Sequence, residues 1–163
     1  RVCEELKDEV DWILIDSPAG IERGFRNALA PADIVLVVTN PEVSSVRDAD
    51  RIIGLVEAEE KGPAKLILNR VNPVLTKRGD MLNTDDVLEL LAIELIGVIP
   101  EDESVVVASN KGQPVTLTNN SKAGLAFRNI AKRLLGEEIP FINLETGNNF
   151  LNRIAKMINK RGD

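Results

Sequence analysis

Polar side chains that can bind a phosphate, a metal ion or a purine base follow several short apolar runs in this sequence. Asp16 ends the run at residues 12–15 and precedes a tight turn that contains Pro18 and Gly20. A carboxylate in that position suits an Asp that holds a Mg²⁺-bound water beside a phosphate, and Gly20 lets a backbone N–H approach a terminal phosphate. The same residues also fit an ordinary strand-to-helix turn in which Asp16 caps the helix.

Two later apolar runs end in side chains that suit a purine base. Asn69 and Arg70 end one of them, where an amide can read a purine edge through paired hydrogen bonds and a guanidinium can stack on a ring. Pro100, Glu101 and Asp102 follow the other, where they offer a flat ring and carboxylate acceptors for an exocyclic amine. Residues 40–48 follow a third apolar run and are a further candidate loop. Alone, they also fit an ordinary capped loop that leads into the solvated face of a helix.

The apolar runs alternate with amphipathic segments along the chain. Continuous apolarity within a run predicts a strand covered on both faces, and the segments between the runs have helical periodicity. This alternation predicts an α/β fold, a three-layer parallel sheet with helices on both faces. Ligands bind at the carboxyl ends of such strands, so we expect the polar loops to meet in one crevice. The predicted strands are residues 12–15, 34–38, 66–68 and 95–99, and the predicted helices are residues 22–29, 45–59, 84–91 and 122–135.

The composition narrows the class of protein. The 163 residues, 44% hydrophobic and 28% charged, suit about one soluble globular domain. The absence of His excludes imidazole chemistry, and a single Cys excludes an internal disulfide and a multi-cysteine zinc site. The net charge of −6 argues against a general nucleic-acid-binding surface. No apolar run approaches the roughly 20 residues of a membrane-spanning helix, and the first residues have no apolar stretch typical of a signal peptide. Since the sequence also does not begin with Met, we expect a cytoplasmic protein whose beginning is missing.

The C-terminal residues form a basic amphipathic pattern. On a helix, the apolar side chains of residues 149–160 fall on an arc of roughly 160°, and the Lys and Arg side chains of that stretch lie off it. Residues 149–163 carry four cations and one acid, so the net charge of −6 divides into +3 here and −9 elsewhere. This pattern predicts an interfacial membrane anchor, although a terminal helix packed on the body with its cations outward fits as well. The predicted membrane residues are Phe150, Leu151, Arg153, Ile154, Lys156, Met157, Ile158 and Lys160.

Four stretches of the sequence carry a resemblance to a known family. They are DSPAGIE at residues 16–22, TNPEVSSVRDADRIIG at 39–54, RGDML at 78–82 and GVIPED at 97–102. Together they resemble the MinD family of septum-site-determining ATPases, within the deviant Walker A (ParA-like) P-loop class. The first stretch alone indicates only that wider class, whereas the second is specific. The similarity runs across essentially the whole chain.

The resemblance implies an ATPase that uses ATP and Mg²⁺. By it, Asp16 is the Walker B carboxylate on the Mg²⁺ side of ATP, which it reaches through water. Residues 17–20 belong to the switch loop that senses the γ-phosphate, so Asp16 and Gly20 are the predicted catalytic residues. The adenine pocket would consist of Asn69, Arg70, Pro100 and Asp102.

The resemblance also implies partners. Residues 41–44 would lie near the interface of an ATP-bound homodimer. The following helix would bind a MinC-like division inhibitor and a MinE-like activator through Arg47, Asp48, Asp50 and Arg51, and no nucleic-acid partner is expected. The last helix would hold this cytoplasmic protein on the inner face of the cell membrane. Because one short anchor binds only marginally, joining two of them in a dimer would raise the avidity roughly 10²- to 10⁴-fold.

One departure from the family concerns the phosphate loop. The family's Lys-Gly-Gly-x-Gly-Lys-Thr motif is absent, and Lys111-Gly112-Gln113 has neither its length nor its Ser or Thr. In the family this loop follows a strand that would lie between the strands predicted at residues 12–15 and 34–38. We therefore expect a P-loop fold that is incomplete at its N-terminus and a fragment that alone neither binds ATP tightly nor hydrolyses it.

The expected organisation is the C-terminal part of a P-loop ATPase domain (residues 1–135), a linker (136–148) and an amphipathic membrane-targeting helix (149–163). The whole protein would position the division septum by recruiting the inhibitor. Two alternatives stay open: a flagellar-number or chromosome-partitioning ATPase of the same class, and a non-catalytic module that recruits partners to the membrane.

Overall fold

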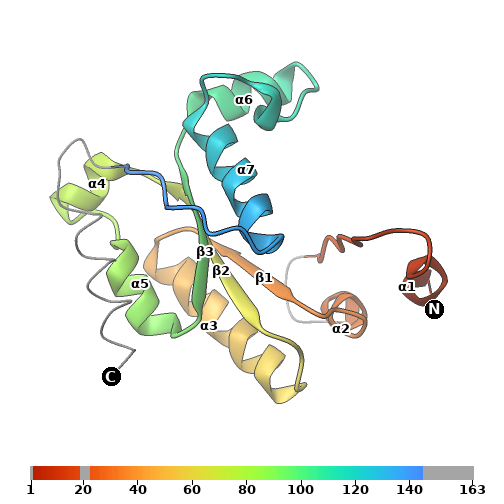
Figure 1. The fold of residues 1–163 in the computed structure, drawn as a ribbon. Coiled ribbons are helices and arrows are strands. Elements are labelled where there is room, and N and C mark those ends of the chain that lie inside the picture. Colours follow the sequence, from red (N-terminus) through yellow and green to blue (C-terminus); the bar gives the residue numbers. More distant parts are fainter. Residues whose placement is uncertain (1, 19–22, 145–163) are drawn as a thin grey trace.

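The computed structural model describes residues 2–18 and 23–144 and is built around a parallel sheet (Figure 1). Three strands, β1 (Val35–Thr39), β2 (Ala64–Val71) and β3 (Glu94–Pro100), lie in the order β1-β2-β3. Both neighbouring pairs are parallel, so the carboxyl ends of all three strands lie at the same edge. That edge is where α/β proteins bind their ligands.

Helices cover both faces of the sheet. In Figure 1, α3 and α5 cover one face and α7 covers the other, and buried side chains of these helices form the two cores. The predicted three-layer α/β fold is therefore confirmed. None of the described helices is long and apolar enough to cross a membrane. The helices are α1 (Val2–Leu6), α2 (Arg23–Leu29), α3 (Val43–Ala58), α4 (Pro73–Arg78), α5 (Thr84–Leu91), α6 (Glu103–Asn110) and α7 (Lys122–Leu134), with one 3-10 turn, η1 (Val115–Leu117).

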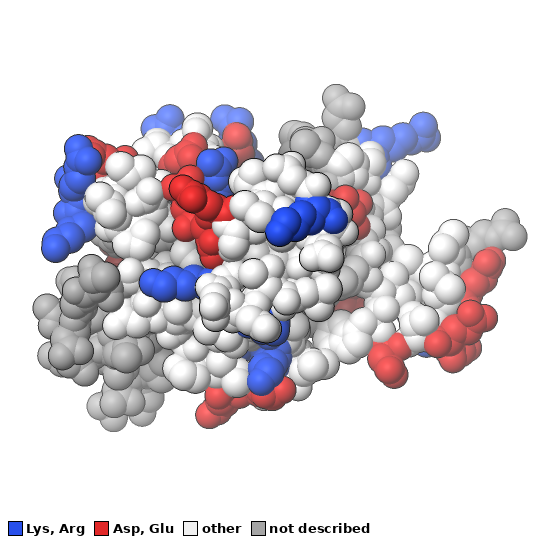
Figure 2. All heavy atoms as spheres, turned by 90° about the horizontal axis from the view of Figure 1, so that it is seen from above, with Lys and Arg blue, Asp and Glu red and all other residues white. Residues whose placement is uncertain are grey.

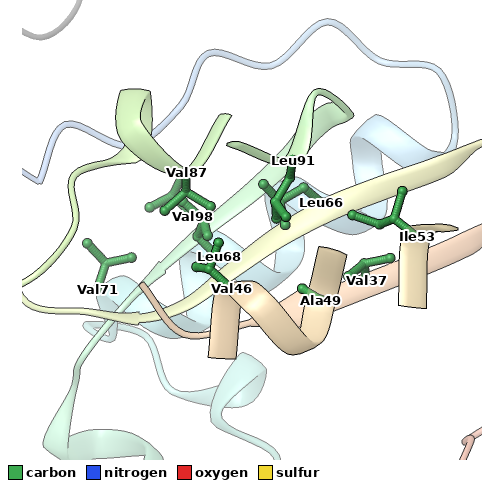
Figure 3. Close-up of a cluster of buried hydrophobic side chains, with 10 residues drawn as sticks. All are labelled: Val37, Val46, Ala49, Ile53, Leu66, Leu68, Val71, Val87, Leu91 and Val98. Atoms are coloured by element: carbon green, nitrogen blue, oxygen red, sulfur yellow. The ribbon is translucent and has the colours of Figure 1, made fainter. Parts of the chain in front are cut away.

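Alternate residues of β2 supply the two cores. Leu66 and Leu68, both completely buried, face α3 and α5, whereas Ile67 faces α7. This two-residue period explains why the strand reads as a continuous apolar run. The α3–α5 core, drawn in Figure 3, consists of Val37, Val46, Ala49, Ile53, Leu66, Leu68, Val71, Val87, Leu91 and Val98.

A bulge in β3 brings α7 close to the sheet. The pairing with β2 shifts by one residue before Gly97, which leaves Ile96 as the extra residue of a bulge. A Cβ on Gly97 would lie 2.3 Å from the side chain of Ile130 in α7. A glycine is therefore required here because the helix occupies the space of a side chain.

A strap formed by residues 137–144 runs from the end of α7 past the outer edge of β3. The Arg133 guanidinium donates hydrogen bonds to the carbonyl oxygens of Ile96 in β3 (2.9 Å) and of Ile139 and Pro140 in the strap (2.9 and 3.0 Å). Three backbone acceptors from two segments are thus held by one side chain. The strap residues that pack on the two cores are Phe141, Ile142 and Leu144, and the Arg133 guanidinium lies 4.2 Å from the Phe141 ring centre.

Replacing Arg133 with Met should release the strap, because Met keeps much of the apolar stem but donates no hydrogen bond. We expect the free energy of unfolding to fall by about 2 kcal/mol, measured by urea unfolding. Lys132→Met is the matched control, since Lys132 is exposed and makes only a long 4.0 Å ion pair with Glu137. Equal losses in the two variants would contradict the structural role of Arg133.

The strand predicted at residues 12–15 is not formed. These residues belong to no helix or strand, and Trp12, Leu14 and Ile15 are exposed. A strand needs a neighbour for its backbone N–H and C=O groups, and in the described part of the chain residues 12–15 pair with no strand of the sheet. The apolar pattern was strand-like, but local sequence cannot supply the pairing partner.

Candidate functional site

The structure brings two of the predicted polar loops together at the carboxyl ends of β2 and β3. Val71 pairs with Pro100 in the sheet, and the backbone N–H of Glu101 donates to the Val71 carbonyl oxygen at 2.9 Å. Asn69 and Arg70 at the end of β2 therefore share an edge with the residues that follow β3. Of the predicted base-binding residues, Arg70 is exposed, Asn69 and Asp102 are half-buried, and Pro100 is buried.

Arg70 adopts a left-handed backbone conformation with φ of 55°. For a residue with a side chain, this conformation costs about 1–2 kcal/mol. It coincides with a break in the regular pairing of β2 with β3 between Leu68 and Val71. The Arg70 side chain is 66% exposed. Strained backbone conformations of this kind often occur at functional positions, so the conformation of Arg70 supports it as a candidate site residue.

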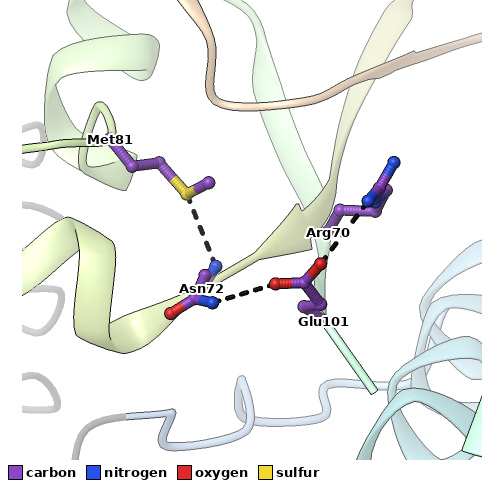
Figure 4. Close-up of polar contacts among 4 residues, drawn as sticks. All are labelled: Arg70, Asn72, Met81 and Glu101. Carbon is purple, nitrogen blue, oxygen red and sulfur yellow. Dashed lines mark hydrogen bonds and ion pairs between the residues drawn. The ribbon is translucent and has the colours of Figure 1, made fainter. Parts of the chain in front are cut away.

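A polar network at the ends of β2 and β3 includes the Arg70 side chain (Figure 4). Glu101 Oε1 lies 3.4 Å from Arg70 Nη2, and Glu101 Oε2 accepts a 2.9 Å hydrogen bond from Asn72 Nδ2. The Asn72 Oδ1 atom accepts from the backbone N–H groups of Val74 and Leu75, which caps α4. The hydrogen bonds from Asn72 and then Arg70 hold the pKa of Glu101 below its ordinary value, so the carboxylate is charged at neutral pH.

Asp102 joins the beginnings of α6 and α7. Its Oδ1 accepts hydrogen bonds from the backbone N–H and hydroxyl of Ser104, and its Oδ2 accepts from the Ser121 hydroxyl and the backbone N–H of Ala123. Burial is the largest single influence and raises the pKa of Asp102, but the hydrogen bonds from these three residues together hold that pKa well below its ordinary value. Asp102 therefore has a structural role that the sequence did not indicate, and an adenine contact by it stays a prediction.

A shallow groove of about 250 Å³ separates the start of α3 from the loop after α4. Pro41 lines one side, and Met81 and Leu82 line the other. The backbone N–H of Leu82 donates to the Pro41 carbonyl oxygen at 3.2 Å, which holds the two segments together. Residues 41–44, predicted to lie near a dimer interface, thus adjoin a second segment that carries the family resemblance.

The four predicted partner-binding residues of α3 share the exposed face of that helix. Arg47, Asp48, Asp50 and Arg51 are all exposed, whereas the opposite face of α3 packs on the sheet. Arg51 and Asp48 form a 3.8 Å ion pair with both side chains more than three-quarters exposed, so the pair contributes little to stability and its charges stay available.

Figure 2 shows the molecule from above, where Lys and Arg side chains and Asp and Glu side chains are interspersed among uncharged residues.

The structure does not bring Asp16 to the edge formed by β2 and β3. Asp16 itself is exposed and lies outside the helices and strands, so its predicted role at the phosphate end stays a prediction. No group of three potential metal ligands occurs among the described residues. Gly20 and the predicted membrane residues, 150–160, lie outside the described part of the chain, so their roles stay predictions.

Sequence reasoning missed Asn72 and Glu101 as members of the polar network. A signal for Asn72 was present, because Asn-Pro followed by Gly79 six residues later marks the start and the end of a short helix. The sequence indicated Glu101 only as a carboxylate acceptor, because its partners Arg70 and Asn72 follow a different strand.

Comparisons with known proteins identify the relatives of this chain. The family model described as cellulose biosynthesis protein BcsQ matches residues 1–135. The septum site-determining protein MinD of Synechocystis is 50% identical over 159 residues, which cover 96% of this chain and 60% of the relative. The chain thus spans about 60% of the length of that relative.

Solved structures show the same similarity. The MinC:MinD cell division protein complex of Aquifex aeolicus matches with 48% identity and a TM-score of 0.82, over 86% of this chain and 59% of that chain. MinD of Pyrococcus horikoshii in complex with Mg-ADP matches with 27% identity and a TM-score of 0.72, over 85% of this chain and 58% of that chain. The resemblance to MinD and the P-loop type of α/β fold are confirmed. The chain therefore belongs to the ParA-like family that the BcsQ model describes, and it is homologous to the septum site-determining MinD proteins.

Proposed function

We propose that this chain is the C-terminal part of a MinD-type cell division ATPase that binds ATP with Mg²⁺. The observation that carries the proposal is the edge at the carboxyl ends of β2 and β3, where Val71, which directly follows Asn69 and Arg70, pairs with Pro100. The guanidinium of Arg70, which is exposed and paired with Glu101, fits the face of a purine, and the half-buried Asn69 amide fits its edge. The relatives named MinD support the same function.

Asp16 and Gly20 would serve the phosphate end of the nucleotide. Asp16 is a single exposed carboxylate, which suits Mg²⁺, since that ion keeps several waters and binds one or two carboxylates together with substrate phosphates. The Mg²⁺ ion would neutralise charge on the phosphates, and Asp16 would orient one of its waters. The Gly-rich loop for the phosphates is not in this sequence, so a complete site needs residues that this chain does not contain.

The same proposal includes a homodimer, a membrane and protein partners. ATP would join two copies near residues 41–44, and the exposed charges of α3 would bind a MinC-like inhibitor and a MinE-like activator. The helix at residues 149–163 would bind an anionic membrane surface, which would keep a cytoplasmic protein at the inner face of the cell membrane. The relative solved as a MinC:MinD complex supports the inhibitor as a partner.

Calorimetric titration with Mg-ATP tests the nucleotide site. We expect the full-length protein that contains this chain to bind ATP and the chain alone to bind none at micromolar concentrations. Arg70→Ala in the full-length protein should weaken binding about 10-fold, because a stacked guanidinium contributes about 1–2 kcal/mol. Arg78→Ala is the matched control, since Arg78 is also exposed and ion-paired, to Asp80 at 3.2 Å.

Two results would contradict the proposal. A full-length protein that bound no ATP would exclude the ATPase. Micromolar affinity of the chain alone would show that the residues described here suffice, and the expectation of an incomplete site would be wrong.

A further inference from the structure

We propose that Glu101 is a positioning residue of the base site, which acts by holding the Arg70 guanidinium at the carboxyl edge of the sheet. The inference rests on the proposed nucleotide-binding function and gives Glu101, which the sequence suggested only as an acceptor for an exocyclic amine, a positioning role toward Arg70. It depends on the juxtaposition of Arg70, Asn72 and Glu101 at the ends of β2 and β3 (Figure 4).

The position of the Glu101 carboxylate is fixed from two sides. Its backbone N–H extends the sheet by donating to Val71 at 2.9 Å, and its Oε2 atom accepts from Asn72 Nδ2 at 2.9 Å. Asn72 in turn cannot rotate freely, because its Oδ1 atom accepts from the first N–H groups of α4. The remaining carboxylate oxygen, Oε1, therefore points from a defined place toward Arg70 (Figure 4).

The contact with Arg70 joins one guanidinium nitrogen to Glu101 and leaves most of the Arg70 side chain exposed. The ion pair joins Arg70 Nη2 to Glu101 Oε1 at 3.4 Å, and 66% of the Arg70 side chain remains exposed. A long flexible side chain loses rotamer entropy when it stacks on a ligand, and a partner that restricts it beforehand reduces that loss. Glu101 thus prepares Arg70 to stack on a base without occupying the stacking surface.

The strained backbone of Arg70 supports the same role. With φ of 55°, the residue occupies a conformation that side chains disfavour. The pairing irregularity of β2 and the ion pair with Glu101 together direct this side chain across the ends of the two strands. Such a combination is expected where the direction of one side chain matters.

The test measures the affinity of full-length variants for two probes, Mg-ATP and inorganic triphosphate, by calorimetry. Glu101→Ala should raise the Kd for ATP about 5-fold, the size expected for an exposed charge pair, and should leave the Kd for triphosphate unchanged because triphosphate has no base. Glu101→Gln should lie between, since its amide oxygen can still accept from Asn72 but carries no charge. Glu103→Ala removes the same charge from an exposed neighbour and should change neither Kd.

A double-mutant cycle separates positioning from direct contact. In an Arg70→Ala background, Glu101→Ala should cause no further loss of ATP affinity. A loss that persisted in that background would mean that Glu101 contacts the nucleotide itself, and the positioning role would be wrong. Equal effects on ATP and triphosphate would also contradict it. If the full-length wild type bound no ATP, the proposed function would fall first and the inference with it.

Discussion

Truncation of the full-length protein before Phe150 should lower its ATP-dependent binding to anionic vesicles at least about 100-fold, because it removes both anchors of a dimer and with them the avidity that linking them supplies. Each Lys or Arg near an anionic surface contributes about 1 kcal/mol before salt screening, and a single short anchor binds only marginally. Removing both anchors of a dimer should also remove the +3 charge of residues 149–163 from each chain, whereas residues 1–148 of this sequence carry −9. Vesicle co-sedimentation with and without ATP measures the change.

A matched pair of substitutions distinguishes the apolar arc from charge alone. Ile154→Glu places a carboxylate on the predicted apolar arc, whereas Asn152→Glu places the same charge on the polar side. We expect Ile154→Glu to approach the truncated protein and Asn152→Glu to retain most of the binding at 0.15 M salt, roughly physiological ionic strength. Undiminished vesicle binding after truncation would mean that residues 149–163 are not the anchor. Equally tight binding by monomer and ATP dimer would contradict the avidity mechanism.

Replacing Asp102 with Ala should lower the free energy of unfolding by about 3 kcal/mol, because partly buried donors lose a charged acceptor. The backbone N–H groups of Ser104 and Ala123 and the hydroxyls of Ser104 and Ser121 all donate to this carboxylate. The cost is large because the donors lie at the starts of two helices, α6 and α7, so a single substitution removes a hydrogen-bond acceptor from both helix starts. Urea unfolding monitored by circular dichroism gives the change.

The effect of Asp102 should depend on pH with a defined sign. Its pKa is lower in the folded protein than its ordinary value, so the fold favours the charged form. The contribution is complete above the ordinary pKa of about 3.9 and is lost as the pH falls through the lower pKa of the folded state. The difference between wild type and Asp102→Ala should therefore narrow below about pH 4. Glu103→Ala, an exposed neighbour, is the control, and an equal loss in both variants would contradict the capping role.

Local patterns predicted the elements that bury one continuous face. The helix expected at residues 45–59 is α3 (Val43–Ala58), whose buried residues Val46, Ala49, Ile53 and Val56 repeat at intervals of three and four. The strands expected at residues 66–68 and 95–99 form the buried parts of β2 and β3. These patterns depend on neighbours along the chain, so the sequence alone suffices to find them.

The apolar periodicity did not predict the short helices α4 and α6, for different reasons. α6 contains the three consecutive valines 105–107, which as β-branched residues lower the helix propensity, and its start depends on the cap formed by Asp102. α4 has only six residues, too few for a period to show. In both cases the deciding signal lies at the helix start rather than in the apolar pattern.

The sequence predicted part of the candidate site. The sequence indicated that Asn69 and Arg70 lie at the end of one strand and Pro100 at the end of another, because a polar residue after an apolar run marks a strand end. It did not indicate that Glu101 would hold Arg70, or that Asp102 would accept four hydrogen bonds. Both facts depend on which strands become neighbours and on where α7 begins.

The sequence by itself determined the three strands of the sheet, the helices α2, α3, α5 and α7, the family, the positions of polar loops and the charge of the C-terminal segment, since each depends on composition, on a local motif or on short-range period. The tertiary structure alone decided that residues 12–15 remain outside the sheet, that Arg133 holds the strap, and that Asn72 and Glu101 fix Arg70. These outcomes require groups more than a few residues apart to meet at hydrogen-bond distance. Hydrogen bonds depend on distance and direction, which a linear pattern of polar and apolar residues does not contain.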